Sequence, residues 1–186
     1  MKDIQADDPR LPIRYWCQDE TRIGLKTLLG RRLTSIGVKP IAEVQWPRKA
    51  IWLYGIVSPS TGESFFWEYS HLDKICFEDF LQRICEAFPQ YLNVIQMDGA
   101  PAHMAQDIEI PDNIVLLVQP AHSPELNPIE RLWLDLKVDL RGVNFSNLDE
   151  LRLAISQILE YMTPEWIASL TGYGFILRAL SDALIT

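Results

Sequence analysis

The chain has 186 residues, of which 48% are apolar, and its 25 acidic and 17 basic residues give a formal net charge of -8. This length and apolar fraction fit one folded domain with a buried core and exclude an intrinsically disordered chain. No apolar run reaches the roughly 18 residues of a membrane-spanning helix, and the polar start of the chain lacks the pattern of a secretory signal, so we expect a cytoplasmic protein.

The first predicted element is a strand, followed by a basic segment. Apolar and polar side chains alternate over residues 13–18, which predicts a strand that ends at Asp19 and Glu20. Residues 24–49 mix glycine, arginine and proline with short apolar pieces, as in a hairpin or a long basic loop. Residues 14–49 contain eight basic and three acidic residues although the whole chain is acidic. This segment fits an anion-binding surface as well as a solvated run of charges.

The middle of the chain predicts a hairpin, a helix and two further strands. Residues 50–57 and 63–69 are rich in aromatic and β-branched side chains and flank the turn sequence SPSTG, as in a β-hairpin. Residues 73–88 show helical spacing of apolar side chains and are followed by a proline. Residues 91–97 and 114–118 are short apolar runs, which predict two buried strands with a short helix between them.

The last third of the chain predicts helices. Residues 120–128 contain three prolines and form a loop or turn, residues 129–140 and 148–162 have helical patterns, and Thr163 begins a last short helix. The order of elements predicts an α/β fold in which helices cover the faces of a mixed sheet. No linker is apparent, so one domain is expected.

Three acidic residues stand where the chain changes element. Asp19 is expected to close the first strand, Asp98 directly follows the strand at residues 91–97, and Glu130 opens the helix at residues 129–140. If the two strands pair, Asp19 and Asp98 become neighbours at one edge of the sheet. Carboxylates gathered in this way repel one another unless a cation lies among them, and oxygen ligands favour magnesium or manganese. The pattern therefore points to metal-dependent phosphoryl transfer.

Each carboxylate also has a purely structural interpretation. Asp19 and Asp98 are compatible with ordinary turns. Asn127, Pro128 and Glu130 fit a helix start, with Asn127 as the N-cap and Glu130 completing a capping box. Taken one at a time, the three residues leave both interpretations open.

Three strings in the sequence resemble those of a known family. They are CQDE at residues 17–20, MDGAPAH at residues 97–103 and QPAHSPELNPIERLWLDLK at residues 119–137. In order and spacing they resemble the catalytic domain of the DDE transposases, in particular the bacterial insertion-sequence branch of the mariner superfamily. The resemblance covers about residues 12–142.

The resemblance implies a ribonuclease-H-like fold, with a mixed five-stranded sheet flanked by helices, and a catalytic triad of Asp19, Asp98 and Glu130. The triad would hold two Mg²⁺ or Mn²⁺ ions. Between Asp98 and Glu130 stand 31 residues, close to the low thirties typical of the superfamily. The implied reaction is cleavage at the transposon end by a metal-activated water, then attack of the freed 3′ hydroxyl on target DNA, usually at a TA dinucleotide. A homo-oligomer is expected in the active state.

Other residues are assigned supporting roles. His103 would contact the scissile strand or orient a ligand, and a structural role is equally open. Asn127 would fix Glu130 by capping its helix. Lys137 lies on nearly the same helix face as Glu130 and would reach a phosphate, unless it is an ordinary solvated lysine. The candidate stripe for binding the DNA backbone consists of Arg22, Lys26, Arg31 and Arg32.

Tryptophans and cysteines are assigned structural roles. The cysteines are odd in number and none stands in a C-x-x-C pair, so reduced thiols are expected rather than disulfides or a zinc site. Four tryptophans are assigned to packing rather than to base stacking, namely Trp16, Trp52, Trp67 and Trp133.

Only about a dozen residues precede the first strand, whereas transposases of this family usually carry an N-terminal helix-turn-helix region. We therefore expect residues 1–11 to form a tail, residues 12–142 the catalytic domain and residues 143–186 helices that pack on the same domain. A separate helix-turn-helix polypeptide would then recognise the transposon ends, in the nucleoid of a prokaryotic cell. Two alternatives are a catalytically silent remnant that binds DNA or protein, and a structure-specific nuclease on the same fold.

Overall fold

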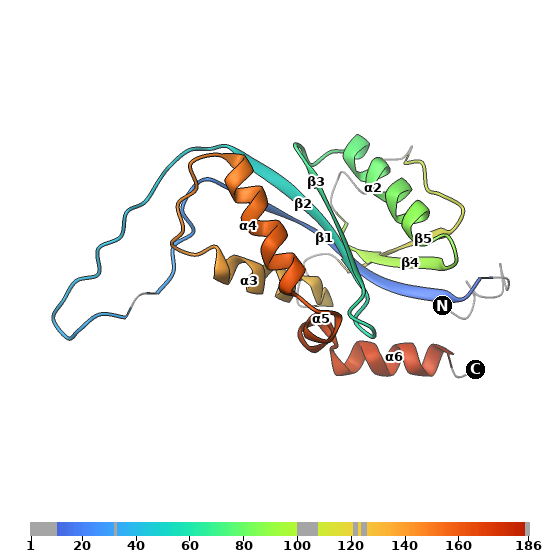
Figure 1. The fold of residues 1–186 in the computed structure, drawn as a ribbon. Coiled ribbons are helices and arrows are strands. Elements are labelled where there is room, and N and C mark those ends of the chain that lie inside the picture. The colour runs from blue at the N-terminus through green and yellow to red at the C-terminus, as the bar shows by residue number, and fades with distance from the viewer. Residues whose placement is uncertain (1–10, 32, 100–107, 121–122, 124–125, 185–186) are drawn as a thin grey trace.

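The computed structural model describes residues 11–31, 33–99, 108–120, 123 and 126–184, and it shows a sheet with helices on both faces (Figure 1). The strands are β1 (Ile13–Gly24), β2 (Ala50–Val57), β3 (Ser64–Tyr69), β4 (Leu92–Met97) and β5 (Ile114–Val118). Their order across the sheet is β3-β2-β1-β4-β5, where β1, β4 and β5 are parallel and β2 is antiparallel to both of its neighbours. The predicted mixed five-stranded sheet is confirmed.

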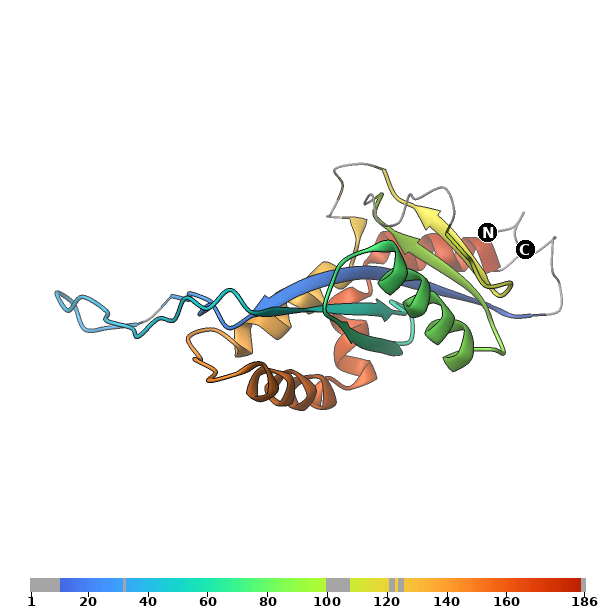
Figure 2. The same ribbon diagram turned by 90° about the horizontal axis from the view of Figure 1, so that it is seen from above.

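The helices form two layers (Figures 1 and 2). One face of the sheet is covered by α2 (Lys74–Ala87), and the other by α3 (Ile129–Asp139), α4 (Leu148–Tyr161) and α5 (Pro164–Thr171), after which comes α6 (Gly174–Leu184). Side chains of β1 alternate between the two cores, since Trp16 packs in the cluster under α2 and Cys17 in the cluster under α3. Asp19 therefore faces the α3 side.

Strand β1 is longer than the sequence predicted. It continues to Gly24, so the expectation that Asp19 closes the first strand is wrong. The extension is stabilised by antiparallel pairing with β2, which runs from Cys17 to Gly24, and by Ile23, which is buried under α3. Pairing of β1 with β4 stops earlier, at Cys17 and Gln96. Asp19 thus lies inside β1, where β4 no longer covers its other edge.

Residues 25–31 and 33–49 form an arm that projects from the sheet between β1 and β2 (Figures 1 and 2). Its described residues contain no helix or strand, so of the two predictions the long loop is confirmed. Near the sheet the two sides are joined by Leu25 N–H to Lys49 O at 3.0 Å and Thr27 N–H to Gln45 O at 3.2 Å. Further out, the apolar side chains of Leu33, Ile36 and Ile41 are exposed.

Other elements differ from the prediction in detail. β5 is an edge strand and is only half-buried, because nothing pairs with its outer side among the described residues. A short helix was predicted between β4 and β5; residues 108–113 of this interval contain no helix, and residues 100–107 lie outside the described part of the chain. α6 follows α5, which the sequence indicated as the last helix. No described helix is long and apolar enough to cross a membrane.

Candidate active site

Strand register places Asp19 and Asp98 near each other. Tyr15, Trp16 and Cys17 pair in parallel with Val94, Ile95 and Gln96, and the pairing ends there. Asp19 and Asp98 both stand two residues further along, so both carboxylates follow the end of the same pairing. The predicted neighbourhood of the two carboxylates is therefore built by the β1–β4 pairing.

Helix α3 supplies the third carboxylate. Its buried face, formed by Ile129, Leu132, Trp133 and Leu136, packs on the β1–β2 side of the sheet. Glu130 lies in the first turn and is half-buried. Three residues later, Trp133 Nε1 donates a hydrogen bond to Asp19 Oδ2 at 3.0 Å. The helix thus carries Glu130 to the region of Asp19 and contacts that carboxylate directly.

Asn127 does not cap helix α3. The N-cap is Pro128, whose backbone is already in the helical region and which makes no side-chain cap. Asn127 is 2% exposed, and its Nδ2 donates to the backbone oxygen of Gln18 at 2.8 Å. The β1–β4 pairing ends at Cys17, so the buried backbone carbonyl of Gln18 has no partner on β4. The amide of Asn127 bonds this carbonyl instead of the start of α3. The predicted supporting role remains a proposal, now with Gln18 as the contact.

Replacing Asn127 with Ala is expected to lower the free energy of unfolding by about 1.5 kcal/mol, because the carbonyl of Gln18 loses its buried donor. Urea denaturation measures the effect. Asn144→Ala is a suitable control, since Asn144 is exposed and bonds Thr27 and Glu43 in the loop region. A loss below about 0.5 kcal/mol would show that the Asn127–Gln18 bond does not stabilise the start of α3.

The surroundings of Asp19 disfavour its ionised form. Burial, followed by the charges of Glu130 and Glu20, raises the pKa of Asp19 from 3.8 to about 8; a hydrogen bond from the backbone of Glu20 lowers it, and the charge of Asp98 makes the smallest of these contributions, which raises it. The contributions of Glu130 and Asp98 mean that both carboxylates lie within electrostatic reach of Asp19. Three carboxyl groups are therefore held near one another on the α3 side of the sheet.

The residues present fit a divalent cation by donor type and charge. Carboxylate oxygens are the ligands that Mg²⁺ and Mn²⁺ prefer, and a cation would relieve the repulsion that raises the pKa of Asp19. Among the described residues, however, no group of three or more acidic, histidine or cysteine side chains is gathered tightly enough to hold a metal ion. The carboxylates are thus near one another without forming a closed ligand set.

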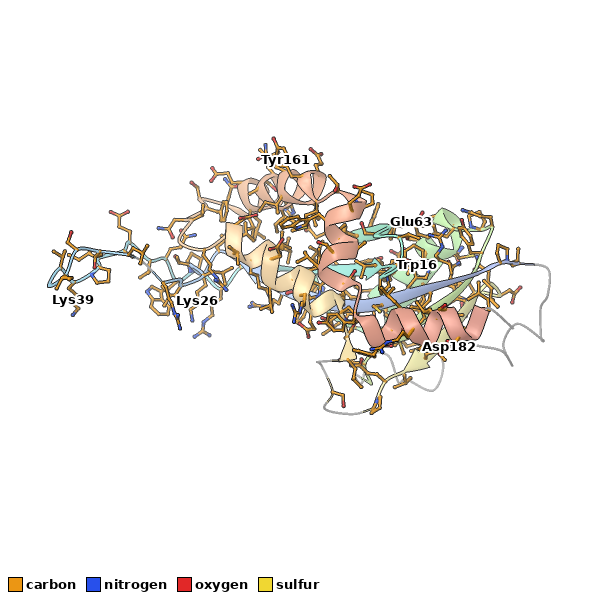
Figure 3. The ribbon with its side chains drawn as sticks, turned by 90° about the horizontal axis from the view of Figure 1, so that it is seen from below. Trp16, Lys26, Lys39, Glu63, Tyr161 and Asp182 are labelled. Carbon is orange, nitrogen blue, oxygen red and sulfur yellow. The ribbon has the colours of Figure 1, made fainter. Side chains whose placement is uncertain are left out.

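The base of the arm is positively charged. A pocket of about 550 Å³ there is lined by Arg22, Lys26, Arg48 and Lys49 among its nine residues, none of which is acidic. Figure 3 shows Lys26 near the base and Lys39 near the tip of the arm. Arg22 and Lys26 were predicted DNA contacts, whereas Arg48 and Lys49 were not singled out. Their RK sequence before β2 was visible, but only the folded arm brings it beside Arg22, which donates to the Arg48 carbonyl at 3.1 Å.

The remaining predicted contacts are dispersed. Arg31 lines a second pocket, of about 840 Å³, together with Arg141, which follows the end of α3. Lys137 lies in the last turn of α3, about 10 Å along the helix axis from Glu130, so the two are not brought together. Arg32 and His103 fall outside the described residues.

Comparison with known protein families gives one match over most of the chain. A family model described as "DDE superfamily endonuclease" matches residues 14–152. The Sinorhizobium fredii protein y4pE/y4sA is 30% identical over 83 residues, which are 44% of this chain and 62% of that protein. The Tcb2 transposase of Caenorhabditis briggsae is 32% identical over 88 residues, which are 44% of this chain and 32% of that transposase. The chain spans less than two thirds of either relative.

Solved structures of the Mos1 transposase resemble the fold. A paired-end complex of Mos1 with the left transposon end matches with a TM-score of 0.67 and 16% identity, covering 91% of this chain and 54% of Mos1. A Mos1 paired-end complex with Mn matches with a TM-score of 0.69 and 16% identity, covering 98% and 57%. At this level of identity the likeness concerns the fold alone, and it confirms the predicted ribonuclease-H-like architecture.

Proposed function

The chain belongs to the DDE endonuclease superfamily, and from this membership we propose that it is the catalytic part of a transposase. It would cut DNA at transposon ends and join the freed ends to target DNA. The proposal is supported by the transposases among its relatives and by the likeness of its fold to Mos1.

One observation carries the proposal more than any other. The β1–β4 pairing ends two residues before both Asp19 and Asp98, and the charges of Glu130, on the facing helix, and of Asp98 both raise the pKa of Asp19. All three lie within the segment matched by the family model. Placing three carboxylates near one another costs free energy, because they repel one another. A purely structural role in turns does not require this cost, so the arrangement favours a functional site.

In the proposed mechanism, Asp19, Asp98 and Glu130 would hold two Mg²⁺ or Mn²⁺ ions. Such ions, when bound, activate the attacking oxygen and stabilise the leaving oxygen of a phosphodiester. In cleavage, water forms the new phosphorus–oxygen bond and a 3′ hydroxyl leaves; in strand transfer, that hydroxyl attacks and a 3′ oxygen of the target leaves. Each step exchanges one phosphorus–oxygen bond for another, so one set of carboxylates serves both and no energy-rich cofactor is required.

Finer features of the proposal follow the resemblance. We assign the chain to the bacterial insertion-sequence branch of the mariner superfamily, with TA as the target dinucleotide and the nucleoid as the place of action. The solved Mos1 assemblies include a paired-end complex and a strand transfer complex, which supports DNA binding and a homo-oligomeric active state for this chain too. Recognition of the ends by a separate helix-turn-helix polypeptide stays a prediction.

The test combines metal binding with DNA chemistry. Calorimetric titration of the chain with Mn²⁺ is expected to show binding that Asp98→Asn weakens strongly and that Asp139→Asn, an exposed position on α3, leaves unchanged. Supercoiled plasmid is expected to be nicked in the presence of Mg²⁺ or Mn²⁺, and a pre-cleaved 3′ end is expected to be joined to target plasmid. Nicking without joining would favour the structure-specific nuclease.

A catalytically silent remnant is the second candidate. The observation that favours it is that the described acidic side chains form no closed ligand set. If the chain is a remnant, calorimetric titration with Mn²⁺ is expected to show no heat of binding, or a heat of binding that Asp98→Asn leaves unchanged. Its DNA binding is expected not to depend on divalent metal.

The basic pocket at the base of the arm is proposed as a contact for the DNA backbone. Changing Arg48 and Lys49 together to Gln is expected to weaken binding of a random duplex about tenfold at low salt and to reduce the slope of log K against log[salt] by about two, because two phosphate contacts are lost. Fluorescence anisotropy over a salt series measures both. The control removes two exposed charges elsewhere, with Lys39→Gln at the arm tip and Arg178→Gln on α6. If the slope of log K against log[salt] is the same in the two double variants, the pocket does not contact the DNA backbone.

A further inference from the structure

We propose that Trp133 is a positioning residue for Asp19: its indole N–H holds Oδ2 of the carboxylate so that Oδ1 is presented to a divalent cation. The inference rests on the proposed function, since it concerns the same carboxylates. It assigns a specific task to a side chain that the sequence pattern marked only as part of the core.

The hydrogen bond joins the two elements that build the site. Trp133 is 1% exposed, and its Nε1 lies 3.0 Å from Asp19 Oδ2. It stands three residues after Glu130 on α3, so one helix carries both a proposed ligand and the group that orients another. A shift of α3 along the sheet would therefore move Glu130 and turn Asp19 together.

A glycine on the neighbouring strand makes room for the indole. Gly55 is the direct cross-strand partner of Asp19. A Cβ at Gly55 would come within 2.6 Å of Trp133 Cη2 and 2.8 Å of Phe66 Cδ1, closer than atoms can pack. The Trp133 ring therefore lies directly on the backbone of β2, where any larger residue would push it away.

Phe66 on β3 holds the ring from another side. The Phe66 and Trp133 rings meet edge to face, with centroids 5.9 Å apart and an angle of 60° between their planes. Contacts with Gly55, Phe66 and Asp19 thus fix the indole's position, its tilt and the direction of its N–H. Hydrogen bonds from residues that do not themselves bind the metal orient the side chains that do, and their removal typically lowers metal affinity by about 10- to 100-fold.

A purely structural role makes a different prediction. A buried tryptophan needs an acceptor for its N–H. In this alternative, Asp19 only accepts the hydrogen bond that Trp133 needs, and Trp133 does not orient Asp19 for metal binding. Trp133→Phe separates the two roles, because it keeps an aromatic ring on Gly55 and removes the donor. In a structural role the variant loses stability but binds metal as before; in a positioning role it also loses metal affinity.

The chain supplies a control bond of the same type at a more exposed tryptophan. Trp166 on α5 also donates its Nε1 to an aspartate, Asp135 Oδ2, at 3.0 Å. Trp166→Phe therefore removes the same kind of bond outside the proposed site. Calorimetric titration with Mn²⁺, on proteins shown by circular dichroism to be folded, is expected to give about tenfold weaker binding for Trp133→Phe and wild-type binding for Trp166→Phe. Plasmid nicking by Trp133→Phe is expected to recover in part as Mn²⁺ is raised.

Several outcomes would overturn the inference or redirect it. If folded Trp133→Phe binds Mn²⁺ with wild-type affinity, Trp133 has only a structural role in the core and the inference is wrong. If Trp133→Phe does not fold, Phe66→Leu loosens the ring while keeping the N–H, and unchanged Mn²⁺ affinity in that variant would count equally against positioning. Failure of the wild-type chain itself to bind Mn²⁺ would instead refute the proposed function, so the two failures are distinguishable.

Discussion

Replacing Asp19 with Asn, Asp98 with Asn or Glu130 with Gln is expected to reduce metal-dependent nicking of plasmid DNA by at least about a thousandfold in each case. Each change removes one negative charge from a group that acts on a single bound cation pair. Losses of residues that act as a unit are strongly non-additive, so a double variant of Asp19 and Glu130 is expected to be little worse than either single one. Gel assays of supercoiled plasmid over a range of Mn²⁺ concentrations measure the rates.

Asp139→Asn is the matched control for this series. Asp139 is exposed at the end of the same helix that carries Glu130, nine residues further along. Its variant is expected to nick at the wild-type rate, and all variants are expected to keep the wild-type circular dichroism spectrum. Nicking above about a tenth of the wild-type rate in any folded triad variant would show that the assigned carboxylate does not take part.

The strands and their turns were predictable because their signals are local. The hairpin of β2 and β3 is announced by SPSTG between two β-rich runs, and residues 114–118 match β5 at both ends. What the sequence left open was which strands pair. The neighbourhood of Asp19 and Asp98 was conditional on pairing, and the register of Cys17 with Gln96 supplies that condition.

Features of the site that escaped prediction depend on contacts between distant parts of the chain. Asn127 matched a helix N-cap by local preference, yet its amide bonds the carbonyl of Gln18, 109 residues away. Trp133 looked like an ordinary core residue, because nothing in the string ERLW indicates that its N–H faces Asp19. Tertiary partners outcompeted the local rule in both cases.

Strand β1 shows the same limit in its length. The alternation that predicted a strand was counted only to Gln18, and the polar residues that follow hide its continuation to Gly24. Antiparallel pairing with β2 satisfies the backbone of this polar stretch, so it stays extended without an apolar pattern of its own. The result matters for chemistry, because a carboxylate inside a paired strand is held more rigidly than one in a turn.

Repulsion among the carboxylates that we assign to metal binding is expected to lower the free energy of unfolding of the metal-free protein. The variant Asp19→Asn tests this. The pKa of Asp19 is raised from 3.8 to about 8 by burial and by the neighbouring charges. Below pH 3.8 both the folded and the unfolded chain carry the proton. Between 3.8 and 8 the folded chain binds a proton that the unfolded chain has released, so the stability of the wild type falls as the pH rises through this window.

Asn cannot ionise and keeps an oxygen to accept from Trp133, so the variant escapes this loss. The shift of the Asp19 pKa from 3.8 to about 8, at ~1.4 kcal/mol for each pKa unit, sets an upper bound of roughly 6 kcal/mol. Because relaxation of the metal-free site lowers the repulsion, we expect Asp19→Asn to be more stable than the wild type by about half of this bound, on the order of 3 kcal/mol at pH 8.5, or roughly 6–12 °C in Tm. The difference is expected to shrink steadily as the pH is lowered toward 5. Differential scanning calorimetry in EDTA measures it.

Added Mn²⁺ is expected to reduce the stability advantage of Asp19→Asn over the wild type. A cation bound by the folded chain stabilises it by mass action, and only the wild type keeps the full set of charges, so its Tm at pH 8.5 is expected to rise more than that of Asp19→Asn. A variant that is less stable than the wild type in EDTA at pH 8.5, with no change of the difference between pH 5 and pH 8.5, would mean that Asp19 is not under electrostatic strain. The carboxylates would then lack the repulsion that a bound cation is expected to relieve.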